Sequence, residues 1–353
     1  MRYINVSKIK EGMLLGQDIF DTNGFLLLRR GQPLHRTYID RLHKIGINGL
    51  YIEDELTDDI KITPVVKPET RMNAVKNIRT MYLKAASNWG ETDNVVDEAV
   101  AAVQHIADEI FFCAKPIYDI YEFKTEKDYR YYHTINMTTI AMIIGTGLNM
   151  KKQELRMLGI CAAFCDIGLN NYDQELLESS NSLSEEEINA IKNHPVTGFS
   201  MLSEKRGIHA RIRQGVLHHH ERWNGTGYPG HLKGDQISLF ARIIAIADVY
   251  DALISNRPYR PAVMPYEAFE YIMANGGILF DPDIVKVFTR KVAAFPVGTK
   301  IMLSNGNKGY VKFNYSDCAL RPVVKVFDRK EMKIIDLKND PGALNLTIQS
   351  AAE

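Results

Sequence analysis

The amino-acid sequence predicts a mainly helical protein, with a helical bundle as its core and small β-containing modules at both ends. Between residues 71 and 290, apolar residues recur at the three- and four-residue spacing of helices. In residues 1–63 and from residue 291 onward, short apolar runs alternate around glycine and asparagine turns. We therefore predict an N-terminal module over 1–63, a linker over 64–70, a helical domain over 71–290 and a β module over 291–353. A chain of 353 residues suits such a division, because it is too long for one ordinary core.

Composition and charge are typical of a globular protein that dissolves in water. Hydrophobic residues make up 45% of the chain, and the formal net charge is zero, so no global field draws it to nucleic acid or anionic lipid. No apolar run approaches the roughly 18 residues that a membrane-spanning helix needs, and the first residues lack the apolar core of a secretory signal. The four cysteines provide no disulfide framework. We predict a cytoplasmic protein that has no membrane span and binds no nucleic-acid polymer.

The N-terminal module is predicted from its turns. Two apolar runs flank Thr22-Asn23-Gly24, and Asn-Gly is a strong signal for a hairpin. Residues 37–52, "TYIDRLHKIGINGLYI", then predict a short helix and a closing strand. Prolines at 64 and 68 indicate a stiff linker.

Two helices of the core are predicted from their apolar faces. The stretch "HTINMTTIAMIIG" places on one face His133, Met137, Ile140, Ala141 and Ile144. The stretch "LRMLGICAAFCD" places on another face Leu155, Leu158, Ala162, Cys165 and Asp166.

A third helix is predicted from its capping signals. Ser184 and Glu187 form a capping box, with a hydrophobic staple between Leu183 and Ile188. This helix leads to His194. At the C-terminus, residues 296–313 and 321–337 alternate as strands do, which predicts the final β module.

Six polar residues lie at or near the ends of predicted apolar helix faces, where an unpaired polar side chain costs free energy. They are His133, Asp166, His194, His219, His220 and Asp248. Taken singly, each histidine is more often a satisfied structural residue than a ligand. Taken together, imidazoles and carboxylates facing a bundle core suit divalent Fe, Mn or Zn, and a bundle core can hold two metals.

Longer motifs occur in the same region. They are "HHERWNGTGYPG" (219–230), "ARIIAIADVYDAL" (241–253), "RPYR" (257–260) and "FDPDIV" (280–285). With these motifs, residues 105–290 resemble the HD-GYP family, a branch of the HD-domain metal-dependent phosphohydrolases. The resemblance implies an HD-type helical bundle. It also implies hydrolysis of cyclic di-GMP, a bacterial second messenger in signal transduction, to pGpG or GMP.

The same resemblance assigns roles to the six polar residues. His133 and Asp248 would bind the first metal, and Asp166 would bridge two metals as the catalytic aspartate. The second metal would lie among His194, His219 and His220. The family's optional third metal needs a glutamate where this chain has Tyr129, so at most two metals are expected.

Substrate contacts are implied for the residues around "GYP" and "RPYR". Tyr228 would lie in a tight loop beside the metals, while Arg257, Tyr259 and Arg260 would hold phosphate or guanine. The plainer alternatives are a structural turn at Tyr228 and solvated surface arginines.

The sequence departs from the family at two positions that matter for chemistry. Family members read HDIGK where this chain has Cys165, Asp166, Ile167, Gly168 and Leu169. Cys165 replaces a metal-binding histidine: it is either a substituted ligand or a small buried hydrophobic residue. Leu169 replaces a lysine that would contact phosphate. His218, one position out of register on its helix, is not expected to replace the lost ligand.

Three functions remain open after these departures. The first is a metal-dependent phosphodiesterase with one or two metals per chain and weakened activity. The second is a catalytically degenerate receptor, which binds cyclic di-GMP or a related cyclic dinucleotide and signals to a protein partner or a second copy of the chain. The third is a scaffold that binds neither nucleotide nor metal. Because one histidine is lost, the metal content is expected to be nearer one than two per chain, unless Cys165 coordinates.

Overall fold

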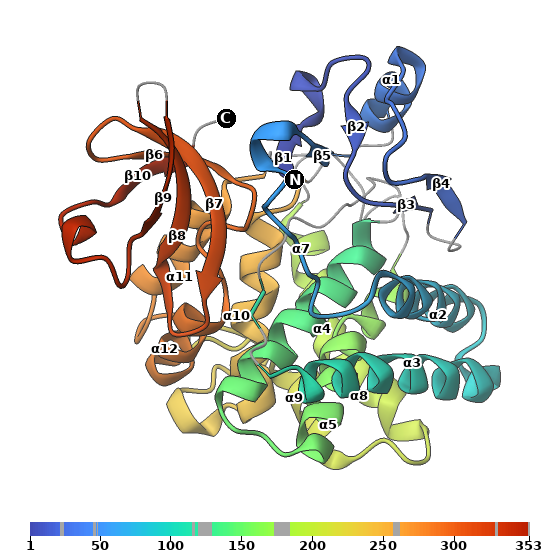
Figure 1. Ribbon diagram of the computed structural model, residues 1–353. Coiled ribbons are helices and arrows are strands. Elements are labelled where there is room, and N and C mark those ends of the chain that lie inside the picture. The colour runs from blue at the N-terminus through green and yellow to red at the C-terminus, as the bar shows by residue number, and fades with distance from the viewer. Residues whose placement is uncertain are drawn as a thin grey trace.

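The computed structural model describes residues 1–21, 25–44, 47, 49–114, 117–118, 129–172, 184–256, 262–328 and 331–351. It confirms the predicted fold class, because a helical core lies between β-containing parts at the two ends of the chain (Figure 1). The predicted domain boundaries stay predictions.

The N-terminal part contains two small antiparallel sheets. Strands β1 (Arg2–Asn5), β5 (Gly49–Glu53) and β2 (Leu14–Leu15) pair in the order β1-β5-β2. Strands β3 (Ile19–Phe20) and β4 (Leu26–Leu28) pair as the predicted hairpin requires, although its turn at 22–24 lies outside the described residues. Helix α1 (Arg36–Lys44) precedes β5, which confirms the predicted helix and strand. Residues of this part form a hydrophobic cluster of their own.

The helical core consists of α2 (Pro68–Ser87), α3 (Asp93–Phe112), α4 (Tyr129–Gly147), α5 (Lys152–Phe164), α7 (Glu185–Ile191), α8 (His194–Glu204), α9 (Ala210–His218), α10 (Leu239–Leu253), α11 (Pro265–Ala274) and α12 (Pro282–Lys291). None of the helices described here combines the length and apolar character that crossing a membrane requires.

Helix α4 corrects the prediction of a single apolar face. All its residues from Tyr131 to Gly145 are buried, because α4 packs against α5, α10 and α12 and also touches α2 and α3. A helix enclosed on all sides must be apolar or satisfied on all sides. His133 therefore lies inside the protein, whichever face is considered.

Two helix starts are set by local chemistry. Helix α2 begins at Pro68, so the predicted linker over 64–70 ends three residues too late. Proline suits the first turn of a helix, since its missing N–H is not needed there. The capping box at the start of α7 is confirmed: Ser184 N donates to Glu187 Oε2 at 2.7 Å, and Glu187 N donates to Ser184 Oγ at 3.2 Å. Leu183, the other half of the predicted staple, lies outside the described residues.

The C-terminal part is a five-stranded antiparallel sheet. Its strands are β6 (Lys300–Leu303), β7 (Lys308–Tyr315), β8 (Cys318–Asp328), β9 (Glu331–Asp336) and β10 (Ile348–Ala351), in the order β10-β6-β7-β8-β9. The sheet stands beside α11 and α12 (Figure 1), and its buried residues belong to the same hydrophobic cluster as the helices. It also touches the N-terminal part, where Tyr3 N donates to Gly298 O at 3.2 Å.

Candidate metal centre

Asp166 lies in a tight turn between α5 and the short 3-10 helix η4 (Ile167–Asn171). This turn packs directly on the start of α8. A Cβ atom on Gly168 would lie 2.1 Å from the carbonyl oxygen of His194 and 2.7 Å from the nitrogen of Gly198. Only glycine allows the two backbones to approach this closely. Backbone packing therefore brings Asp166 beside His194.

Two histidines are oriented by hydrogen bonds to carbonyl oxygens one turn earlier. His194 Nδ1 lies 2.8 Å from Ile191 O, and His219 Nδ1 lies 2.6 Å from Val216 O. A carbonyl oxygen can only accept, so each Nδ1 carries the proton and donates it. In the neutral form of each ring, Nε2 carries the lone pair with which histidine binds a metal.

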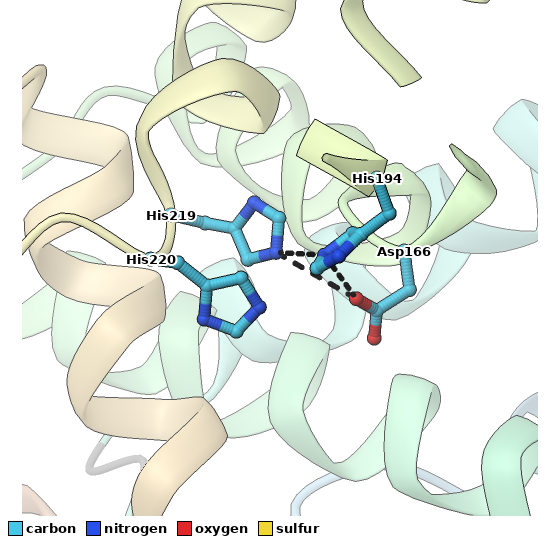
Figure 2. Close-up of side chains that lie close together, drawn as sticks. All are labelled: Asp166, His194, His219 and His220. Atoms are coloured by element: carbon cyan, nitrogen blue, oxygen red, sulfur yellow. Dashed lines mark hydrogen bonds and ion pairs between the residues drawn. The ribbon is translucent and has the colours of Figure 1, made fainter. Parts of the chain in front are cut away.

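The two Nε2 atoms and the Asp166 carboxylate converge at one point (Figure 2). His194 Nε2 and His219 Nε2 lie 3.1 Å apart, and Asp166 Oδ1 lies 3.4 Å from the first and 3.6 Å from the second. His220 also faces this point, and the four potential ligand atoms all lie within 4.8 Å of one another. We call Asp166, His194, His219 and His220 the His/Asp cluster.

The donor set of this cluster fits a divalent transition metal. Three imidazoles and one carboxylate are ligands that Zn, Fe and Mn accept. The histidine tautomers are already those that coordination requires, as in metal sites where a second hydrogen bond fixes each ring.

Burial and neighbouring charges shift the pKa values of Asp166 and His220. Burial acts to raise the pKa of Asp166, but the imidazoles of His194 and His219 outweigh burial and keep this pKa well below its ordinary range. Burial also lowers the pKa of His220 well below its ordinary value, with His219 as a further cause. The aspartate is therefore anionic and the His220 imidazole neutral near neutral pH.

Tyr228 is held against the cluster by the loop that follows the histidines. Its ring stacks on His220, with ring centres 4.8 Å apart and planes 26° apart. The loop is tied down by the buried carboxylate of Glu221, which accepts hydrogen bonds from Gly230 N at 2.6 Å and Leu232 N at 3.0 Å. Burial raises the pKa of Tyr228, so its hydroxyl keeps its proton and can act as a donor.

His133 and Asp248 pair with each other and lie outside the His/Asp cluster. His133 Nε2 lies 3.2 Å from Asp248 Oδ1, and His133 Nδ1 lies 2.6 Å from Asp251 Oδ2. Burial acts to lower the pKa of His133, but the two carboxylates outweigh it and raise the pKa to about 9. The imidazole is thus occupied on both sides. Tyr129, at the position of the optional third metal, stacks on the same ring at 5.4 Å.

Cys165 also stays outside the cluster. Its side chain is buried, and burial raises the pKa of its thiol well above the ordinary value, with Asp166 and Asp248 as further causes. A neutral thiol is a poor ligand. Of the seven candidate metal ligands, the structure thus brings four together and leaves His133, Asp248 and Cys165 apart.

The substrate candidates divide in the same way. Tyr228 lies at the cluster, whereas Arg257, Tyr259 and Arg260 lie outside the described residues.

Sequence reasoning missed three residues that shape this centre. Asp251 contacts His133. The sequence feature that could have indicated this contact is its position three residues after Asp248 on the same helix. Glu221 anchors the Tyr228 loop, and only its position directly after the histidines could have marked it. Arg130 donates from Nη2 to Asp166 O at 2.9 Å, a contact between distant segments that no spacing indicates.

Comparison with known proteins identifies the fold family. Residues 117–284 match the family described as HD domain. This stretch of the chain is similar to an HD domain. Among solved structures, Bd1817, an HDG"Y"P protein from Bdellovibrio bacteriovorus, superposes with a TM-score of 0.50 at 16% identity, over 81% of this chain and 97% of that one. This likeness shows the shared fold, and the domain match agrees with the resemblance found from the motifs.

Two curated relatives have names that state an activity. Cyclic di-GMP phosphodiesterase PA4108 of Pseudomonas aeruginosa is 29% identical over 279 residues, which are 79% of this chain and 66% of that protein. Cyclic di-GMP phosphodiesterase response regulator RpfG of Xanthomonas campestris is 37% identical over 155 residues, which are 44% of this chain and 41% of that protein. This chain therefore matches less than two thirds of either relative's length.

Proposed function

We propose that this chain hydrolyses cyclic di-GMP, or a related cyclic dinucleotide, to pGpG or GMP in a metal-dependent reaction. The observation that supports this most is the His/Asp cluster, in which three imidazoles and a carboxylate converge inside an HD domain. The names of the two relatives point to the same substrate class.

The cluster residues would hold one divalent metal, Fe, Mn or Zn. When bound, such a metal supplies Lewis-acid polarisation of the phosphate and makes hydroxide available near neutral pH. Asp166, anionic in spite of its burial, would orient the attacking water as the catalytic carboxylate. Tyr228, protonated and packed on His220, would donate a hydrogen bond to the substrate, and Arg257, Tyr259 and Arg260 would complete its binding.

We further propose that activity is weak, because Cys165 and Leu169 replace the histidine and the lysine of the family motif. His133 and Asp248 satisfy each other, and Cys165 offers a neutral, buried thiol. Leu169 adds no charge at the place where the family has a lysine. Removing one preorganised electrostatic contact commonly costs about 10²–10³ in rate. We expect slow turnover with about one metal per chain.

The test is to purify the protein anaerobically, count metals per chain, and follow release of pGpG and GMP from cyclic di-GMP with Mn or Fe supplied. Wild type should hold about one metal, and His220→Ala should remove most of it. Two metals together with turnover of roughly 1 s⁻¹ or faster would contradict the weakened site. Absence of both metal and nucleotide binding would overturn the function itself.

A second function, a cyclic dinucleotide receptor without turnover, is favoured by the pairing of His133 with Asp248 and Asp251. The double variant Cys165→His, Leu169→Lys separates the two functions. It should raise hydrolysis of a weak enzyme, because the histidine restores a ligand and the lysine a phosphate contact. A receptor that has lost more than these two groups should stay inactive. A protein partner or second copy of the chain, and a cytoplasmic location, stay predictions from the sequence.

A further inference from the structure

Arg130 is a half-buried cation that lies beside the His/Asp cluster. It belongs to the first turn of α4, three residues before His133. Its Nη2 donates to the backbone oxygen of Asp166 at 2.9 Å, and its guanidinium carbon lies 4.6 Å from the centre of the Tyr82 ring. These contacts fix the direction of the guanidinium, so the charge is held in one place.

No carboxylate of the described residues pairs with this guanidinium. Two other half-buried arginines pair with carboxylates: Arg156 makes two hydrogen bonds to Asp108, and Arg242 contacts Asp281 at 2.8 Å. Arg130 differs from them. Its Nε is buried without a partner, and its Nη1 has no hydrogen bond to any described residue. Leaving a charge partly buried and unpaired costs free energy unless an anion completes the site.

The position of the guanidinium relates it directly to Leu169. The carbonyl oxygen of Asp166 accepts from Arg130 Nη2 at 2.9 Å and from Leu169 N at 3.0 Å. Arg130 therefore reaches the start of η4 from another helix. The carboxylate of the same Asp166 belongs to the His/Asp cluster. The guanidinium therefore contacts the backbone of a residue whose side chain is part of the proposed metal site.

We propose that Arg130 binds a phosphate of the substrate, supplying from α4 the positive charge that Leu169 cannot supply. The inference rests on the proposed function, because it assigns a further contact to the same site. A guanidinium has five N–H donors and suits phosphate geometry. One of the five is used by Asp166 O, and Nη1, which has no partner among the described residues, would donate to a phosphate oxygen.

The test compares Arg130→Gln and Arg130→Lys with wild type and with a control, Arg36→Gln, which lies in the N-terminal part and pairs with exposed Asp40. Binding of cyclic di-GMP and of inorganic phosphate is measured by calorimetry on the metal-loaded protein at several salt concentrations. Metal content and the thermal midpoint are recorded for each variant. Loss of a charge-assisted hydrogen bond should weaken binding about 10- to 100-fold in Arg130→Gln. Arg130→Lys should recover part of the lost affinity. The control, Arg36→Gln, should bind both probes as wild type does.

The outcomes separate this inference from the proposed function. If Arg130→Gln binds both probes as wild type does, the inference is wrong and the proposed function stands. If wild type binds no cyclic di-GMP but its phosphate affinity still depends on Arg130, the proposed substrate is wrong and the phosphate contact stands. If Arg130→Gln and Arg130→Lys both lose metal and stability, Arg130 is a structural residue and the inference is wrong. Wild type binding neither probe would overturn both.

Discussion

Replacing Gly168 by alanine should disrupt the metal centre without changing any ligand. The added Cβ would lie 2.1 Å from His194 O and 2.7 Å from Gly198 N, and both of these are backbone atoms that cannot rotate away. Ordinary contact begins at 3.4 Å, so η4 and α8 must separate by more than 1 Å. Asp166 and His194 lie on opposite sides of this contact, and their ligand atoms are now 3.4 Å apart.

The expected cost follows from overpacking. Extra atoms in a packed core cost about 1–3 kcal/mol, and contact with backbone favours the upper end of this range. Metal sites tolerate ligand displacements of only about 0.2 Å, and changes around the ligands lower metal affinity about 10- to 100-fold. Gly168→Ala should therefore lose metal in a competition with a chelator and unfold at a lower temperature.

Two other glycines provide matched controls for this substitution. At Gly198 the added Cβ would meet side-chain carbons of Val216 and Ile167 at 3.2 and 3.3 Å, so Gly198→Ala should have a milder effect at the same interface. At Gly342 the nearest atom is the carboxylate oxygen of Asp340 at 3.3 Å, far from the cluster, so Gly342→Ala should keep all its metal. Wild-type metal affinity in Gly168→Ala would refute the reasoning that backbone packing places Asp166.

Three further changes test other parts of the structure. Cys165→Ala should keep its metal and lose about 1 kcal/mol of stability through the small cavity; a metal loss as large as that of His220→Ala would make the cysteine a ligand. Glu221→Ala leaves two backbone N–H groups of the Tyr228 loop without their acceptor, at about 1–3 kcal/mol each, so calorimetry should show weaker cyclic di-GMP binding at unchanged metal content. Asp59, whose pKa is lowered from 3.8 to about 2 by Lys312 and Lys325, stabilises the fold above pH 3.8 and loses this effect as the pH falls through 2. Asp59→Asn should thus lower the thermal midpoint at pH 5 but not at pH 2. The loss in free energy of unfolding should be no more than about 1 kcal/mol, because the pair is partly exposed.

The sequence by itself determined the fold class, the hairpin and helix of the N-terminal part, and the capping box of α7. These features depend on contacts between residues a few positions apart, so spacing alone reveals them. The linker was less well predicted, because Pro68 could either continue an extended segment or begin a helix, and packing chose the helix. The enclosure of α4 was also not readable from one segment, since it depends on all the helices around it.

Only the tertiary structure decided which candidate ligands meet. His133 and Asp248 read from the sequence as ligands of a first metal; in the structure they contact each other, Asp251 contacts the far side of the imidazole, and their metal-binding role stays a prediction. Arg130 and Glu221 acquired their roles through contacts with Asp166 and the Tyr228 loop. The physical reason is the separation of the interacting residues along the sequence. Residue types and short spacings determine which groups lie on a helix face. The direction of a buried polar side chain is instead set by the partner, from anywhere in the chain, that satisfies it at the lowest free energy.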